Sequence, residues 1–193
     1  MTLYVGHWEA KYNGALHMKN FYRHLRDWVL ENEYSKSRSD FDFPEKLYWE
    51  SSASPTGMER WIWWRCVYVP EDNPFYRRIL RINIHQLREK DVEIVKDNKK
   101  FKLQWAEHKI IVDAFIESDY EKRWQKHWLL KHFYRVFVLR FIWRDFKSHK
   151  QEVLQDVYSF LTHVKLYYDS YHWAQPTKSF RPRWGINEKY QYG

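Results

Sequence analysis

The stretch Phe75–Leu87, FYRRILRINIHQL, decides the fold because apolar and polar side chains alternate along it. One face of the extended chain is apolar and the other polar: Tyr76, Leu80, Ile82 and Ile84 against Arg77, Arg81, Asn83 and His85. A period of two is typical of a β-strand that buries one face and leaves the other in water. We therefore expect a sheet with one core face at the centre of this chain.

Further strands are expected on both sides of this stretch. They are residues 2–12, 46–50, 59–69, 92–96, 99–105 and 109–117. Asp97 and Asn98 tolerate positive φ, which suits the turn of a hairpin between two of these strands. Residues 59–69 are apolar on both faces, which predicts a strand covered on both sides. Because the connections are short, the strands should run antiparallel.

A helix is expected directly after the first strand. Asn13 is placed to cap it, and apolar residues then recur at spacings of three and four over about residues 14–33. Lys19, Arg23 and Arg26 lie elsewhere on its surface.

Two more helices are expected after the strands. Capping boxes at residues 118–121 and 148–151 predict their starts, the first helix running to about Lys147. The fold class is therefore α+β: an N-terminal strand and helix, an antiparallel β-meander of about five strands, then a C-terminal helical hairpin and an aromatic tail. We expect one domain over residues 1–168 and an extended tail over 169–193.

Composition restricts the class of protein. Aromatic residues make up 20% of the 193 residues and there are only five glycines, which argues against disorder and against glycine-rich phosphate loops. The single cysteine excludes an internal disulfide. The first residues lack the basic and apolar segments of a signal peptide, and no stretch has the length and apolarity of a transmembrane helix. We expect a cytoplasmic protein or a component of a virion or similar assembly.

No pattern of residues points to catalysis, a metal or a cofactor, and none of these is expected. The ten histidines show no metal-binding spacing. Cys66 lies in an apolar strand, where cysteine is typically inert, although His85 is a conceivable partner. Asp113 and Glu117 share one strand face, with Asp119 beyond, and this arrangement is more typical of a solvated face than of acid–base catalysis.

The positive charge is concentrated in residues 120–150, which hold nine Lys or Arg and two acids, a net +7 of the total +8. Aromatic residues interleave with these cations, which suits an anionic partner such as nucleic acid or a membrane surface. The expected binding residues are Lys131, Arg135, Arg140, Arg144 and Lys147. On a straight helix they divide between two opposite faces, so an amphipathic core helix with solvated cations is the competing interpretation.

The tail is both aromatic and basic, a composition typical of protein interfaces. Its expected interface residues are Tyr171, Trp173, Phe180, Arg181, Arg183 and Trp184. The leading hypothesis is a non-enzymatic structural or binding protein that uses this tail and the basic-aromatic helix for self-assembly or for an acidic partner.

Two alternatives stay open. The order of strand, helix, meander and long helix resembles that of helix-grip ligand-binding domains, from which the additional final helix departs. This resemblance implies a small-molecule binding protein or enzyme with an apolar cavity, lined by Trp61, Trp63, Trp105 and Phe137. Nucleic-acid binding is the other alternative, and it predicts strongly salt-dependent association.

Overall fold

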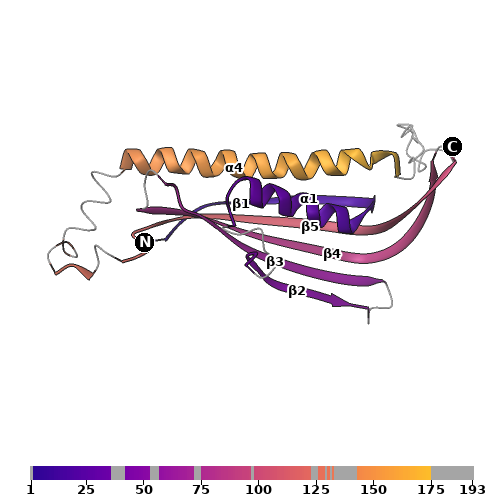
Figure 1. Ribbon diagram of the computed structural model, residues 1–193, viewed down its shortest axis with the longest axis horizontal. Coiled ribbons are helices and arrows are strands. Elements are labelled where there is room, and N and C mark those ends of the chain that lie inside the picture. The colour runs from indigo at the N-terminus through magenta and orange to yellow at the C-terminus, as the bar shows by residue number, and fades with distance from the viewer. Residues whose placement is uncertain are drawn as a thin grey trace, which may run out of the picture.

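The computed structural model describes residues 2–35, 42–52, 57–71, 75–96, 98–122, 126–128, 130, 132 and 143–174. Over these residues the chain forms an antiparallel sheet and two long helices, so the α+β class is confirmed (Figure 1). The elements follow in the order β1 (Thr2–Leu16), α1 (Met18–Glu31), β2 (Glu45–Ser51), β3 (Met58–Tyr68), β4 (Tyr76–Lys96), β5 (Lys99–Ser118), α4 (Trp143–Ser170) and the 3-10 turn η1 (His172–Ala174).

The sheet has five strands in the order β1-β5-β4-β3-β2, all antiparallel. Strands β2 to β5 form the expected meander, and β1 adds to its far edge by pairing with β5. The segment quoted above lies in β4 at the centre of the sheet. Its even-numbered side chains from Tyr76 to Gln86 are buried, so the alternation identified the core face correctly.

Strands β4 and β5 are longer than the sequence predicts, because each joins two segments that were expected to be separate. The change of apolar pattern after Leu87 reflects a register shift between Leu87 and Lys90, where Arg88 has a φ of 59°. A β-bulge of this kind moves side chains to the other face without ending the strand. Asn98, at the hairpin turn, also has a positive φ of 59°, as the sequence indicated.

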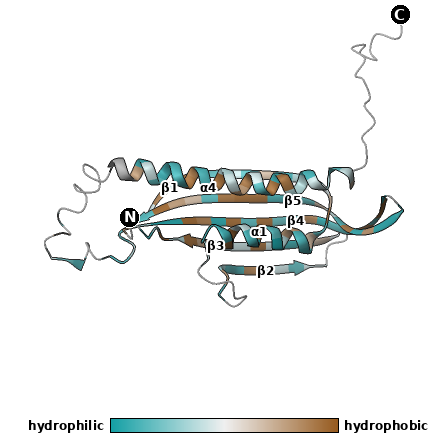
Figure 2. Ribbon diagram, turned by 45° about the horizontal axis from the view of Figure 1, so that its top comes forward, coloured by the Kyte–Doolittle hydropathy of each residue, from teal (hydrophilic) through white to brown (hydrophobic). Residues whose placement is uncertain are grey.

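Both helices lie on the same face of the sheet (Figures 1 and 2). The core lies between the helices and this face, and its fully buried side chains come from every layer: Phe21, Leu25, Ile62, Trp64, Leu80, Ile82, Ile110, Val112, Val157 and Phe160. Helix α4 contacts β1, β5 and α1. Trp28 of α1 packs edge-on against Phe160 of α4, with ring centroids 5.0 Å apart.

The start of α1 differs from the expectation. Asn13 lies inside β1, where it pairs with Glu107, and the helix begins at Met18 with His17 as its N-cap. The His17 ring accepts a hydrogen bond from the backbone N–H of Asn20. The prediction failed because β1 continues along β5 as far as Leu16, and ladder hydrogen bonds outweigh the capping preference of one asparagine.

The start of the C-terminal helix also differs. Helix α4 begins at Trp143, so the predicted capping box at residues 148–151 lies inside it. There the Ser148 hydroxyl donates to Glu152 four residues later. Most of the first arm of the predicted helical hairpin, and the tail beyond Ala174, fall outside the described residues. Within the described chain, no helix combines the length and apolarity needed to cross a membrane.

The second face of the sheet, opposite the helices, bears no described helix or strand (Figure 2). β3 was expected to be covered on both faces, but no described element covers this second face. Trp61 and Trp63 point to this face, because the buried residues Ile62 and Trp64 alternate with them. Trp63 is 38% exposed, so a large aromatic side chain faces outward here.

Candidate functional site

The structure describes only part of the predicted basic-aromatic surface. Lys131, Arg135 and Arg140 lie outside the described residues, as does the side chain of Arg144. Lys147 is exposed on the first part of α4. The function assigned to this surface stays a prediction.

The first residues of the predicted tail pack on their own domain. Helix α4 continues to Ser170, and η1 then places Trp173 against the β4–β5 hairpin. The Trp173 ring lies edge-on to Phe101, with centroids 5.4 Å apart, and Lys96 Nζ lies 4.5 Å from its centroid. Tyr171 packs beside Tyr167 and Trp173. The other predicted interface residues, Phe180, Arg181, Arg183 and Trp184, lie outside the described residues.

The predicted apolar lining of a helix-grip cavity does not converge. Trp61 and Trp63 point to the face opposite the helices. Trp105 packs near the hairpin end beside Leu103 and Ala174, and Phe137 lies outside the described residues. Between α4 and the sheet, side chains such as Val112 and Phe160 are fully buried in one continuous core.

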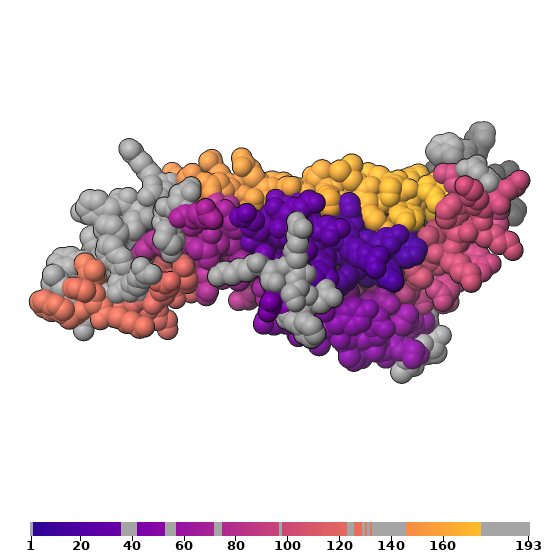
Figure 3. Space-filling model, in the orientation of Figure 1, coloured from indigo at the N-terminus to yellow at the C-terminus, as the bar shows by residue number. Residues whose placement is uncertain are grey.

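An open groove of about 550 Å³ lies between α1 and the β2 side of the sheet. In Figure 3 the indigo surface of α1 borders the purple surface of β2 and β3. Five elements and one capping residue supply its lining, which is His17, Met18, Lys19, Tyr22, Arg23, Arg26, Tyr48, Arg60, Glu89 and Gln104. Helix α1 contributes half of this set. We call this feature the α1–β2 groove.

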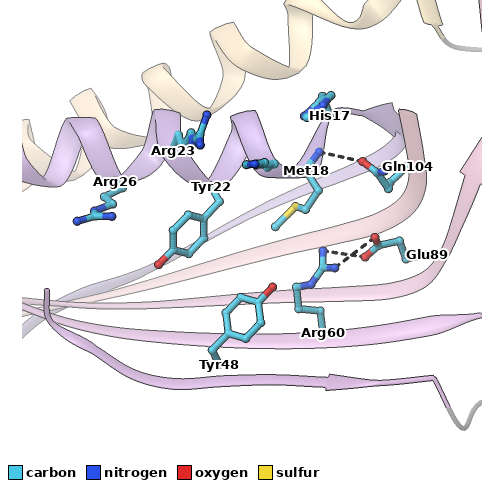
Figure 4. A pocket seen from close by; sticks show the side chains of 10 residues that line it. His17, Met18, Tyr22, Arg23, Arg26, Tyr48, Arg60, Glu89 and Gln104 are labelled. Atoms are coloured by element: carbon cyan, nitrogen blue, oxygen red, sulfur yellow. Dashed lines mark hydrogen bonds and ion pairs between the residues drawn. The ribbon is translucent and has the colours of Figure 1, made fainter. Parts of the chain in front are cut away.

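Two tyrosines from opposite sides form the walls of the α1–β2 groove (Figure 4). Tyr22 on α1 and Tyr48 on β2 meet edge-to-face, with ring centroids 6.4 Å apart. Tyr22 donates its hydroxyl proton to Glu45, and Tyr48 donates to Glu50. Burial and the neighbouring carboxylate raise the pKa of Tyr48 to about 12, so its hydroxyl stays a donor at neutral pH. Half of the Tyr48 surface remains exposed to the groove and solvent.

The floor is a buried polar network centred on Arg60. Its guanidinium contacts both carboxylate oxygens of Glu89, at 2.9 and 3.4 Å, and Glu50 Oε1 at 2.6 Å. It also donates to Gln86 Oε1 at 2.9 Å. The Arg60 and Glu89 side chains are only 9% and 5% exposed, and a charge that is so buried needs such partners. Two carboxylates therefore already compensate the Arg60 charge.

The rim of the α1–β2 groove is cationic. Lys19, Arg23 and Arg26 follow each other at spacings of four and three, so they form one stripe along α1. Lys19 and Arg23 are exposed and form no ion pair with any carboxylate of the described residues. The guanidinium of Arg26 lies over the Phe43 ring, 5.1 Å from its centroid. The uncompensated positive charge of the groove therefore lies at Lys19 and Arg23.

Gln86 links the floor to a buried histidine. Since Gln86 Oε1 accepts from Arg60, its amide nitrogen donates to His108 Nδ1 at 2.8 Å. His108 Nε2 then carries the ring proton, and it has no hydrogen-bond partner among the described residues. Burial, together with the Arg60 charge, lowers the pKa of His108 to about 3, so this ring is neutral at physiological pH.

The other residues weighed for chemistry lie apart from the groove. Cys66 is fully buried in the core, and burial raises the pKa of its thiol to about 12. Asp113 contacts His7 on the outer face, and Glu117 contacts Arg77. Among the described residues, no group of three or more His, Cys, Asp or Glu side chains could hold a metal ion.

Sequence reasoning missed the α1–β2 groove, although one of its signals was visible. The spacing of Lys19, Arg23 and Arg26 already placed three cations on one stripe of the predicted helix. Nothing local in the sequence indicates that Tyr48 and Glu89 would face that stripe, because Glu89 points inward only through the β4 bulge.

Comparison with known proteins does not assign the chain to a family. The sequence matches no protein-family model, and a search of curated proteins finds no match.

Proposed function

We propose that this protein is a non-enzymatic binding protein that holds a small organic anion in the α1–β2 groove. The observation that carries this proposal is the uncompensated pair Lys19 and Arg23 on the rim of a groove whose walls are tyrosine rings. Small-molecule sites usually have volumes of about 300–1,000 Å³, apolar or aromatic walls and a few convergent polar groups. The groove, at about 550 Å³, has a volume in this range and a tyrosine wall, whereas most of its other lining residues are polar or charged.

The lining favours a particular ligand chemistry. A carboxylate or similar acidic group would lie at the rim, where Lys19 and Arg23 offer charge-assisted hydrogen bonds. A flat apolar body would lie against the exposed surfaces of Tyr22 and Tyr48, whose edge-to-face pair forms one aromatic wall of the groove. Arg60 is not the anchor, because Glu50 and Glu89 already bind it. Its network instead keeps the floor rigid, which lowers the entropic cost of binding.

The test is a titration followed by ¹H–¹⁵N NMR. Benzoate, 2-naphthoate and decanoate serve as probes with one acidic group and apolar bodies of increasing size. We expect at least one to bind with a Kd below about 1 mM, which corresponds to roughly 4 kcal/mol of binding free energy. The saturating shifts should map to residues 17–26 of α1 and to β2. If none of the three probes saturates, or if the shifts map elsewhere, the proposal is wrong.

A further inference from the structure

A cluster of cationic and aromatic side chains lies on the outer face of the sheet, opposite the helices and away from the α1–β2 groove. Arg65 of β3 and Arg81 of β4 are directly paired across the sheet on this face. Like charges in directly opposed positions destabilise a sheet. Burial, and next the charge of Arg81, lower the pKa of Arg65. Folding therefore places these two cations together at an electrostatic cost.

Neither arginine forms an ion pair within the described residues, although acids are close. Asp113 is paired with Arg81 in the strand register, yet its carboxylate contacts His7 Nδ1 at 2.7 Å. Glu9 contacts two lysines, and Glu117 contacts Arg77. The nearby charge of Asp113 favours the protonated form of Arg65, but no carboxylate of the described residues directly contacts the guanidinium of Arg65 or Arg81.

Both guanidinium groups are held over aromatic rings. Arg65 lies over Trp63, 5.6 Å from the ring centroid, and Arg81 lies over Phe115 at 4.4 Å. Arg65 also donates to the Asn83 side chain and to the Trp64 carbonyl, both at 2.8 Å. These contacts hold the guanidinium of Arg65 on the sheet, while Arg81 is exposed and, among the described residues, its guanidinium contacts only the Phe115 ring. Two neighbouring guanidinium groups suit a phosphate, which accepts several charge-assisted hydrogen bonds at once.

Aromatic side chains adjoin this pair of cations. Trp61 and Trp63 are two residues apart on the same face of β3, roughly 6.6 Å along the strand. Trp49 of β2 is paired with Trp61, and the Trp61 ring stacks on His85 at 3.6 Å. Trp49 is 45% exposed and Trp63 is 38% exposed, so both rings are accessible to a partner. We call Trp49, Trp61, Trp63, Arg65 and Arg81 the outer-face patch.

We propose that the outer-face patch binds single-stranded nucleic acid, with a phosphate between Arg65 and Arg81 and unpaired bases stacked on Trp63 and Trp49. Exposed aromatic rings beside fixed cations are how a sheet holds single strands, since every base has a face that stacks. A duplex hides those faces, and Asp and Glu side chains supply no flat ring to stack on the tryptophans. The net charge of +8 attracts any polyanion, so charge alone does not select the partner. The exposed tryptophans are what favour single-stranded nucleic acid over other polyanions.

The experiment measures fluorescence anisotropy of labelled twelve-nucleotide dT and rU oligomers with the full chain. A duplex of the same length and poly-glutamate serve as unlabelled competitors. Variants are Trp63→Ala and Arg81→Gln, and Lys165→Ala on the exposed side of α4 is the matched control. Circular dichroism and urea unfolding report whether each variant folds. Arg81→Gln removes the repulsion with Arg65, so the variant should keep most of its stability. A loss of binding in this variant would then reflect a role in binding rather than in folding.

We expect the single strands to bind and the duplex and poly-glutamate to compete poorly. Trp63→Ala should weaken binding about 5- to 150-fold, the usual effect of losing one stacked base. Arg81→Gln should lower the salt dependence, the slope of log K against log salt, by roughly 0.7 for each phosphate lost. A preference for dT or for rU identifies the natural class of strand, and either result supports the proposal.

Three results would overturn it: no binding of either oligomer at 50 mM salt, equal competition by poly-glutamate, or Trp63→Ala and Arg81→Gln binding like Lys165→Ala. The groove proposal depends on other residues, so these results leave it untouched.

Discussion

Arg60 and Glu89 form a buried ion pair across strands β3 and β4, with Nη1 and Oε2 2.9 Å apart. The register shift between Leu87 and Lys90 turns Glu89 inward, and a second shift between Met58 and Arg60 adjusts the facing strand. The register shifts of two neighbouring strands therefore lie at the same place, next to the ion pair on the floor of the α1–β2 groove.

Breaking this pair should be costly. Glu89→Leu leaves the Arg60 charge buried with one fewer partner, and loss of one member of a buried pair typically costs about 3–5 kcal/mol. Replacing both residues, as in Arg60→Met with Glu89→Leu, should recover much of that loss because no buried charge remains. Urea unfolding at pH 7 measures both free energies of unfolding.

The exposed pair Arg88–Glu107 supplies the control. Because water screens it, Glu107→Gln should cost less than about 1 kcal/mol. Equal losses for Glu89→Leu and Glu107→Gln would show that the floor of the groove is not rigidly organised.

Gly57 should tolerate no side chain. Its φ is 135°, and a Cβ placed there would lie 2.9 Å from the Arg88 carbonyl carbon and 2.9 Å from Glu89 O. Backbone atoms of the bulge do not move aside easily, so Gly57→Ala combines strain with a clash. We expect a loss of about 1–3 kcal/mol in urea unfolding. A neutral substitution would mean that the bulge at Arg88 and Glu89 is not held as the structure shows.

His108 should make stability fall in mild acid. Its pKa is lowered to about 3 in the folded protein, whereas an unfolded histidine titrates near 6.5. Between these pH values the unfolded chain binds a proton that the folded chain does not, so acid favours unfolding. From pH 7 to pH 5 this one group should remove about 2 kcal/mol of stability.

The matched variant is His108→Gln, which has no charge to gain in this range. Its free energy of unfolding should be lower than wild type at pH 7 but should change about 2 kcal/mol less between pH 7 and pH 5. Parallel pH profiles for the two proteins would contradict the assignment.

Cys66 should be unreactive in the folded protein. It has no exposed surface, and burial raises its pKa to about 12, so there is almost no thiolate at neutral pH. Ellman's reagent should modify it only as fast as the core opens, and at full rate in 6 M guanidinium. Rapid modification of the native protein would show that the β3 core is open to reagent.

The fold was predictable where one periodic signal dominates. The alternation from Tyr76 to Ile84 identified the buried face of β4, and the spacing of Phe21, Leu25 and Trp28 identified the buried face of α1. The capping predictions at Asn13 and Ser148 failed because a cap is worth about 1 kcal/mol, less than continued strand pairing or continued helix.

The two candidate surfaces depend on features that are not local. Tyr22 meets Tyr48 only because the sheet order brings the edge strand β2 alongside α1. Arg65 meets Arg81 only through the exact register of β3 and β4. Sequence spacing predicts which face a residue occupies within one strand, but the register between two strands is set by turns and bulges.

The most direct test of the proposed function compares an acid with its neutral amide at the α1–β2 groove. Calorimetry gives the Kd of 2-naphthoate and 2-naphthamide for wild type, Lys19→Ala/Arg23→Ala and the control Lys165→Ala. If the rim recognises the anion, wild type and control should bind the acid at least about 10-fold more tightly, a difference of roughly 1.4 kcal/mol, and the double variant should lose that preference. Equal affinity of wild type for the acid and the amide, or an unchanged preference in the double variant, would contradict the account.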